Sequence, residues 1–282
     1  MRAVVTLTSS ESKRLIAKAV VQMPEVKKAM ESAYLLVADG TTNAFIYQEL
    51  TDDFGIKPEH CAIGISTNGV LCVTSPASRQ MFTPVFYKGE PQPKRSFAEA
   101  LTDYHPQTAV IKGVNAVDTQ GFVGIITSGF DGGTIPKIIG PVLSKGLPLI
   151  TPVGLEKLVP SVPEAARAMC GAQNIDISMG ADAGMYCLSN TIIVTEIDAL
   201  RILFHVNATL ACCGGVGGNE GAVTLVAVGE DDSIRQMIEY LEENIKGEPP
   251  VKGNKGNCER CRYKNCRYHG LKEQALPVWL RS

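Results

Sequence analysis

The segment Tyr34-Leu-Leu-Val-Ala-Asp-Gly-Thr-Thr-Asn43 decides the fold of this chain. Its first five residues form a short apolar run that predicts a buried strand, and a helical stretch at 44–50 follows. Glycine and threonine residues lie between the two. This is how α/β proteins build a loop whose backbone amides and hydroxyl groups bind an anion. We therefore expect a ligand cradle at this junction.

Strands and helices alternate outward from this segment in both directions. On its N-terminal side, Thr8 and Glu11 have the spacing of a capping box that begins a helix. On its C-terminal side, an Asn-Gly pair predicts a hairpin between strands at 61–66 and 70–74. Further strands are predicted at 108–117, 122–127, 147–153, 191–195 and 222–228, with helices at 135–144, 163–169 and 196–205. The order predicts an α/β fold with a mostly parallel sheet and helices on both faces.

The last predicted helix closes this α/β domain. It begins at Asp231 or Asp232, and its apolar residues recur at helical spacing, as a core-facing stripe does: Ile234, Met237, Ile238, Leu241 and Ile245. A Lys-Gly-Glu-Pro-Pro sequence at 246–250 then ends the helix. We therefore divide the chain into an α/β ligand-binding domain, 1–250, and a C-terminal tail, 251–282.

The tail contains a dense group of metal-ligand residue types. Cys258, Cys261, Cys266 and His269 follow one another as C-x2-C-x4-C-x2-H. Three thiolates and an imidazole at this spacing close a tetrahedral Zn²⁺ shell, and the turn-forming residues around them bury little apolar surface of their own. We therefore predict a small Cys3His metal-binding appendage, with zinc preferred because histidine suits it and an iron–sulfur cluster as the alternative. The alternatives to a metal site are a disulfide pair with one remaining thiol, or free cysteines in a flexible tail.

Charge is distributed unevenly along the chain. The chain as a whole has a net charge of −2, but residues 251–269 of the tail carry six basic residues against one acid, Glu259: Lys252, Lys255, Arg260, Arg262, Lys264 and Arg267. With two tyrosines among these cations, nucleic-acid binding by the tail is conceivable, although such charges more often solvate a small metal module. We do not favour a nucleic-acid partner.

The bulk composition is that of a globular protein. The 282 residues, with 45% hydrophobic and 20% charged, are enough to bury a large core. No apolar run reaches the length of a membrane span, and the N-terminus lacks a signal-peptide pattern. The nine cysteines follow no disulfide framework. We expect a cytoplasmic protein with no membrane partner, and a homodimer, the commonest assembly for proteins of this kind.

Three glycine-rich loops follow predicted strands, at 39–43, 128–134 and 214–221. Because the carboxyl ends of parallel strands face one crevice, we expect the loops to converge on a single anionic metabolite. The predicted anion donors are the small residues of these loops, Gly40, Thr41, Thr42, Gly133, Thr134, Gly217 and Gly218. Each loop taken alone is also explained as a tight turn.

Four segments resemble the superfamily of ribose-5-phosphate isomerase and glucosamine-6-phosphate deaminase, which also includes CoA transferases and regulatory subunits of translation initiation exchange factors. Residues 36–43 resemble its opening phosphate loop, and 112–118 resemble the isomerases' acidic segment. Residues 132–134 are similar to a Gly-Thr helix start, and 217–221 to a deaminase segment. The resemblance spans roughly 10–228 and implies this fold and a small phosphorylated, carboxylated or CoA-linked ligand.

The chain departs from that pattern where catalysis would occur. The isomerase segment keeps only one of its three acids, Asp118, and the deaminase segment has Glu220 but no histidine. Isomerisation needs a base that reaches a carbon-bound proton, so these two carboxylates are the catalytic candidates; each is also explained as a cap or turn ligand. The resulting prediction is an isomerase, deaminase or transferase with a zinc-stabilised tail. The alternative is a non-catalytic metabolite sensor or assembly subunit whose basic tail contacts a partner.

Overall fold

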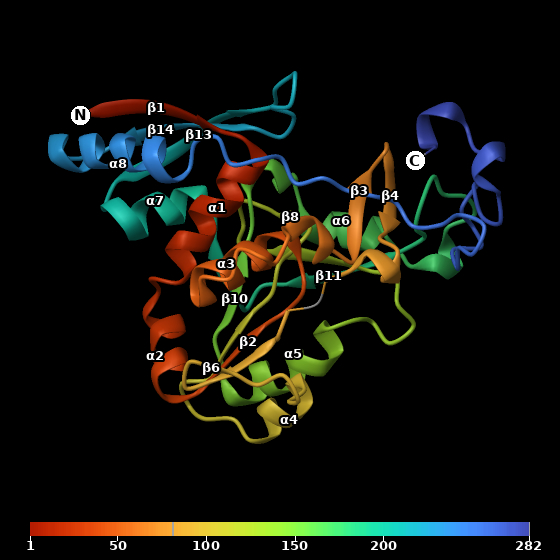
Figure 1. The fold of residues 1–282 in the computed structure, drawn as a ribbon, viewed down its shortest axis with the longest axis horizontal. Coiled ribbons are helices and arrows are strands. Elements are labelled where there is room, and N and C mark those ends of the chain that lie inside the picture. Colours follow the sequence, from red (N-terminus) through yellow and green to blue (C-terminus); the bar gives the residue numbers. More distant parts are fainter. Residues whose placement is uncertain (81, 282) are drawn as a thin grey trace.

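The structure is a computed structural model that describes residues 1–80 and 82–281 (Figure 1). At its centre lies a six-stranded sheet in the order β12-β10-β7-β2-β5-β6. Strands β2, β7, β10 and β12 are parallel, whereas β5 and β6 are antiparallel at one edge. Their bounds are β2 Tyr34–Val37, β5 Val85–Tyr87, β6 Glu90–Pro91, β7 Ala109–Ile111, β10 Leu149–Pro152 and β12 Ile192–Val194. The prediction of an α/β fold with a largely parallel sheet is confirmed.

Strand β2 shows why this sheet is covered on both faces. All four of its residues are buried. Leu35 and Val37 belong to one hydrophobic core, and Tyr34 and Leu36 to another. Successive side chains of a strand point to opposite faces, so an uninterrupted apolar run needs a layer on each side.

Helices provide these layers. One core takes residues from α1 (Ser9–Val20), α2 (Pro24–Ser32), α3 (Thr41–Thr51), α7 (Glu196–Phe204) and α8 (Asp231–Asn244). The other takes residues from α4 (Phe97–Thr102) and α5 (Ile135–Lys145). The predicted capping box at the start of α1 is present, with Thr8 and Glu11 bonding to each other's backbone amides. The predicted stripe of α8 is confirmed by the burial of Ile234, Met237 and Leu241.

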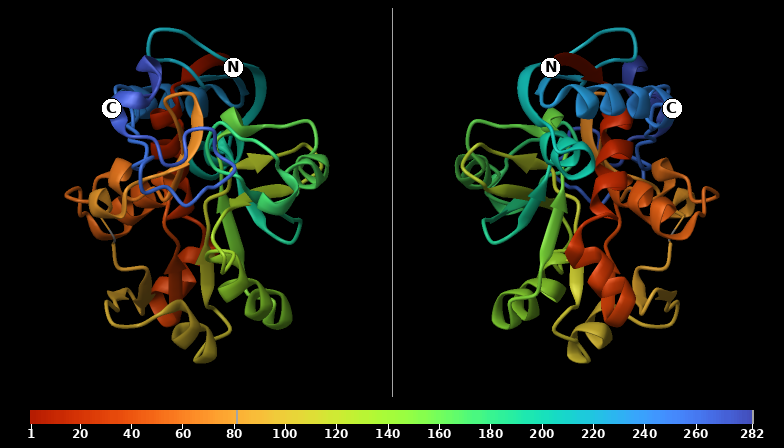
Figure 2. Two further views of the ribbon diagram at one scale, coloured as in Figure 1. Left: turned by 90° about the vertical axis from the view of Figure 1, so that its right-hand side faces the viewer. Right: turned by 90° about the vertical axis from the view of Figure 1, so that its left-hand side faces the viewer.

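A three-stranded antiparallel sheet packs with α7 and α8 at one end of the molecule. Its order is β1 (Arg2–Leu7), β14 (Val223–Val228), β13 (Asn207–Cys213). The glycine-rich segment 214–221 is the connection between β13 and β14, and it projects from the body at the top of both figures (Figures 1 and 2).

Two smaller sheets lie on the side nearest the C-terminus. One has the order β11 (Gly184–Leu188), β9 (Val123–Thr127), β8 (Ala116–Val117), and α6 (Val162–Ala168) packs against it. The other is the predicted hairpin of β3 (Gly64–Thr67) and β4 (Val70–Val73). Its turn residues Asn68 and Gly69 both have positive φ, 50° and 68°, as a tight hairpin turn requires.

The tail follows the surface to this hairpin and folds beside it (Figures 1 and 2). It has little regular structure, with two 3-10 turns at Glu273–Ala275 and Val278–Leu280. A small apolar cluster joins it to the body: Val70, Tyr263, Cys266, Tyr268, Leu276 and Leu280. Within the described residues, no helix is both long and apolar enough to cross a membrane.

Candidate functional site

Two of the three glycine-rich loops do not follow strands of the central sheet, so the parallel-strand argument for their convergence is wrong for these two, although the end of loop 214–221, at Gly221, lies beside Glu156. Loop 214–221 joins two antiparallel strands at the top of the molecule, and loop 128–134 lies in the lower half, between β9 and α5 (Figure 1). Neither follows a strand of the central sheet. The argument that parallel strands aim their ends at one crevice applies only to loop 39–43.

The predicted donors in the two displaced loops are turn residues. Gly217 and Gly218 are exposed, and Gly133 donates its amide to Asp131 Oδ1 at 3.1 Å within its own loop. Thr134 is the residue before α5, and its hydroxyl makes no cap to that helix. Their geometry is that of tight turns.

Loop 39–43 lies at the carboxyl end of β2, as predicted. Gly40 precedes α3 with φ of 145°, and no side chain caps the helix. The amides of Thr41 and Thr42 in the first turn therefore need other partners, which an anion could supply. Within the same turn, Asn43 is fully buried and donates Nδ2 to the carbonyl of Ala38 at 2.7 Å.

Ionisable side chains gather around this loop. We call them the strand-end cluster: Lys13, Asp39, Lys112, Glu156, Lys157 and Glu196. Four elements of the central sheet position them, because Asp39 follows β2, Lys112 follows β7, residues 156–157 follow β10 and Glu196 follows β12. Lys13 comes from α1 and binds Glu156 at 3.0 Å. The parallel topology thus collects charges from distant segments at one edge.

Burial shifts the pKa values of these groups toward neutrality. It raises the pKa of the Asp39 carboxyl, opposed by the Lys112 cation, and it lowers the pKa of the Lys112 amine, opposed by Asp39. Burial likewise raises the pKa of the Glu196 carboxyl. Hydrogen bonds from two backbone amides, that of Glu196 itself and that of Leu155, oppose this rise. Asp39 and Lys112 are only half-buried, so these are desolvated groups that solvent still reaches.

Lys157 has a strongly lowered pKa. Burial, with the neighbouring Lys13 cation, lowers the pKa of its amine from 10.5 to about 8, while Glu156 and Glu196 oppose the change. Its Nζ donates to the carbonyl of Val114 at 3.1 Å. A lysine whose amine is partly neutral near physiological pH is suited to acid–base or nucleophilic chemistry.

The two carboxylates predicted as catalytic lie elsewhere. Asp118 is buried and accepts backbone amides from Gln120, Phe122 and Val162 at 2.9–3.0 Å. These bonds outweigh burial and lower its pKa. Glu220 is exposed and accepts the amide of Gly218 at 3.0 Å. Both have the geometry of turn ligands.

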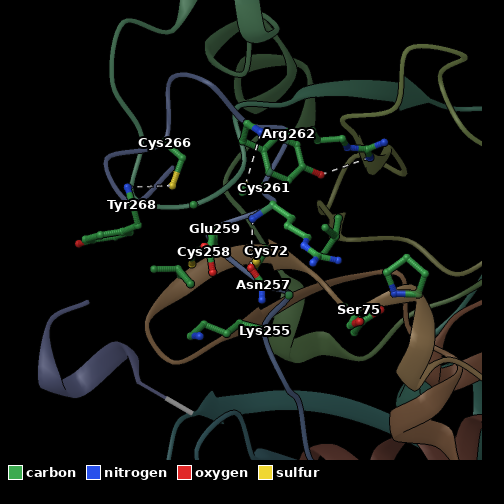
Figure 3. Close-up of a pocket in the computed structure, with 18 of the residues that line it drawn as sticks. Cys72, Ser75, Lys255, Asn257, Cys258, Glu259, Cys261, Arg262, Cys266 and Tyr268 are labelled. Atoms are coloured by element: carbon green, nitrogen blue, oxygen red, sulfur yellow. Dashed lines mark hydrogen bonds between the residues drawn. The ribbon is translucent and has the colours of Figure 1, made fainter. Parts of the chain in front are cut away.

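A cavity of about 660 Å³ lies between the β3–β4 hairpin and the tail (Figure 3). Its lining includes four cysteines, which we call the thiol cluster: Cys72, Cys258, Cys261 and Cys266. Three are the predicted tail cysteines, whereas Cys72 belongs to β4. All four pack in the apolar cluster that joins the tail to the body. His269, the predicted fourth ligand, is exposed.

Cations accompany these thiols. The cavity is lined by Arg79, Lys255, Arg260 and Arg262. Arg79 donates to the hydroxyl and carbonyl of Thr74 at 2.8 and 2.7 Å, and its charge also lowers the pKa of Asp39. Arg79 therefore connects the cavity to the strand-end cluster.

Sequence reasoning missed Cys72, Lys157 and Glu196. Each stands outside any short motif, and only tertiary pairing brings it to its neighbours. The isolated lysine and glutamate just after two predicted strands, at 147–153 and 191–195, were the available signal for the cluster.

As the side chains stand, no three histidine, cysteine or acidic residues of the described chain form a ready metal-ion group. Comparisons of the chain with protein-family models, curated proteins and solved structures find no match.

Proposed function

We propose that this chain binds a small anionic metabolite at the strand-end cluster, and that its tail holds a thiolate-bound metal. The ligand class follows from the charges at the cluster. Lys112 and the N-terminal amides of α3 at Thr41 and Thr42, which no described side chain caps, attract a carboxylate or phosphate group. A CoA-linked or phosphorylated compound carries such a group.

Two buried acceptors carry the proposal. Asn43 Oδ1 and Glu156 Oε2 have no hydrogen-bond partner among the described residues. Burying an acceptor without a donor costs about 1 to 3 kcal/mol, so native proteins rarely leave one unpaired. A ligand with hydroxyl or amino groups supplies the donors that both atoms lack. The preferred ligand is therefore a hydroxylated or aminated anion, such as a sugar phosphate or a hydroxy acid.

The cluster also supports catalysis by proton transfer. The pKa values of Asp39 and Lys112 move toward each other, and Lys157 has a pKa of about 8. Groups that accept and release protons near neutral pH are what an isomerase or deaminase acting beside a carbonyl requires. In this proposal Lys157 takes the acid–base role that the sequence assigned to Asp118 and Glu220.

A sensor function is the second candidate. The backbone partners of Asp118 and Glu220 favour it, because they remove the two carboxylates expected to do chemistry. A sensor would bind the same metabolite and leave it unchanged.

Calorimetry with a panel of sugar phosphates, hydroxy acids and CoA thioesters tests this proposal. We expect at least one panel member to bind the wild type, and Lys112→Met and Asn43→Leu each to weaken that binding about tenfold. Lys94→Met, at an exposed loop lysine, is the matched control and should bind as the wild type does. Equal binding by all four proteins would contradict the assigned site.

NMR of the bound metabolite over time separates the two candidates. An enzyme converts the compound or exchanges its carbon-bound protons with solvent, and Lys157→Met stops the reaction. A compound that stays unchanged with the wild type identifies a sensor.

A further inference from the structure

We infer that Cys72 of strand β4, rather than His269, completes the metal site of the tail, giving four thiolate ligands: Cys72, Cys258, Cys261 and Cys266. This inference rests on the proposed metal site of the tail. It goes beyond the motif in the sequence, because the fourth ligand comes from the α/β domain.

The first support is the arrangement of the four side chains. All four line one cavity and pack in one apolar cluster, and Figure 3 shows Cys72 beside Cys258. The thiol of Cys258 is close enough to the other three to interact electrostatically with each, and that of Cys261 interacts with Cys72 and Cys266. His269 lies on the exposed side of the same turn.

The second support is the backbone around the sulfur atoms. The amide of Tyr263 donates to Cys261 Sγ, and the amide of Tyr268 donates to Cys266 Sγ, each at 3.4 Å. In both cases the donor is two residues after the cysteine. Hydrogen bonds of this kind stabilise the negative charge of a coordinated thiolate and tune the metal.

Charge balance is the third support. Four thiolates around Zn²⁺, or around a [4Fe–4S] core of charge +2, leave a net charge of about −2. Burying that charge needs compensation, and the cavity wall supplies Arg79, Arg260 and Arg262 against one acid, Glu259. Lys255 also lines the cavity, but it pairs with Glu273 at 3.2 Å. Zinc and the iron–sulfur cluster are both metal centres that bind thiolate sulfur, so the same four cysteines suit either one.

The consequence is a cross-link between two parts of the chain. With Cys72 as ligand, the metal fastens the β3–β4 hairpin to the tail and fixes the cavity between them. Because Arg79 lines this cavity and lies near Asp39, the metal site also supports the wall of the strand-end cluster.

The experiment compares metal retention in four full-length proteins: wild type, Cys72→Ser, His269→Ala and the control Cys187→Ser, a cysteine of β11. Each is prepared anaerobically, loaded with zinc or reconstituted with iron and sulfide, then desalted and analysed for zinc, iron and acid-labile sulfide. We expect Cys72→Ser to retain metal about tenfold less well, and His269→Ala and Cys187→Ser to match the wild type. The metal that the wild type retains identifies the form. A His269→Ala protein that loses metal while Cys72→Ser keeps it overturns the inference.

Alkylation of the wild type tests the same ligand set without a substitution. With metal bound, peptide mass spectrometry should show Cys72 protected together with Cys258, Cys261 and Cys266, while the exposed Cys170 and Cys212 react. Reaction of Cys72 at an equal rate with and without metal overturns the inference. A wild type that retains neither metal overturns the metal site itself, which is a different outcome from metal retained without Cys72.

Discussion

Ser128 Oγ and Tyr263 OH lie 2.7 Å apart and join the end of strand β9 to the C-terminal tail. Further contacts hold the tail to the body. Asn265 donates Nδ2 to the carbonyl of Ala172 at 2.8 Å, and Thr67 donates its hydroxyl to the carbonyl of Gly253 at 2.8 Å. The tail is therefore docked through its polar side chains as well as through its apolar cluster.

Removing the Tyr263 hydroxyl should loosen this docking. Tyr263 is buried, so Tyr263→Phe leaves the Ser128 hydroxyl without its partner while keeping the ring in the apolar cluster. We expect the tail to lose about 1 kcal/mol of docking free energy, seen as faster amide hydrogen exchange at 258–270 and unchanged exchange in α1. Ser128→Ala should reproduce the loss of this bond while Arg262 Nη2 still donates to the Tyr263 hydroxyl at 3.4 Å, and the double variant should cost little more than Tyr263→Phe alone. Additive losses would show that the two hydroxyls act independently.

Gly180 is the position where the tail cavity tolerates least change. Its φ is +128°, and a Cβ there would lie 2.0 Å from the carbonyl oxygen of Leu71. Gly180→Ala must therefore push β4 away and displace Cys72 beside it. We expect a loss of about 2 to 3 kcal/mol in urea unfolding, with weaker metal retention.

Gly64 provides the matched control on the same hairpin. Nothing lies within 4 Å of a Cβ built on Gly64, and its φ is outside the positive range. Gly64→Ala should change the free energy of unfolding by less than about 0.5 kcal/mol. Equal effects of the two substitutions would mean that the contact of Gly180 with Leu71 does not constrain the hairpin.

Asp118 should make stability depend on acid pH. Burial raises its pKa, but the amides of Val162, Phe122 and Gln120 outweigh burial and hold the pKa below its ordinary value of 3.8. A carboxyl with a depressed folded pKa stabilises the fold fully above its unfolded pKa, and this contribution is lost as pH falls through the folded pKa. Asp118→Asn should therefore cost about 1 to 3 kcal/mol at pH 7 and much less near pH 2.

Urea unfolding at both pH values checks this prediction. The exposed Asp176→Asn is the control and should differ from the wild type by less than about 0.5 kcal/mol at either pH. A deficit in Asp118→Asn that stays constant with pH would show that shape, not charge, sets the role of Asp118.

Local patterns in the sequence predicted the central elements well. The apolar run at 34–38 became β2, the Asn68-Gly69 pair became the hairpin turn, and the stripe after Asp231 became α8. Each of these elements is determined by residues close together in the sequence, through the geometry of a turn or the spacing of hydrophobic residues. The start of α3 lies earlier than predicted, at Thr41, because Gly40 adopts the positive φ that lets the helix begin directly after it.

Pairings between distant segments were not predictable in this way. The sequence did not predict strand β1, because this strand is buried only through its pairing with β14, near the other end of the chain. The glycine segment 214–221 looked like a ligand loop because its composition suits either role, and only the antiparallel pairing of β13 and β14 makes it a hairpin connection. Cys72 likewise gave no signal, since nothing local distinguishes it from other small apolar residues of a strand.

Lys157 should titrate well below the ordinary pKa of a lysine side chain. Burial lowers the pKa of its amine to about 8, so the folded state binds fewer protons than the unfolded state between about pH 8 and the ordinary value of 10.5. This residue therefore opposes folding below pH 8, and the penalty is relieved as pH rises through that window. Competitive acetylation with peptide mass spectrometry from pH 6 to 11 measures its titration directly. We expect half-titration of Lys157 near pH 8. Titration of Lys157 near the ordinary lysine value of 10.5 would contradict its desolvation and remove it as the acid–base group of the strand-end cluster.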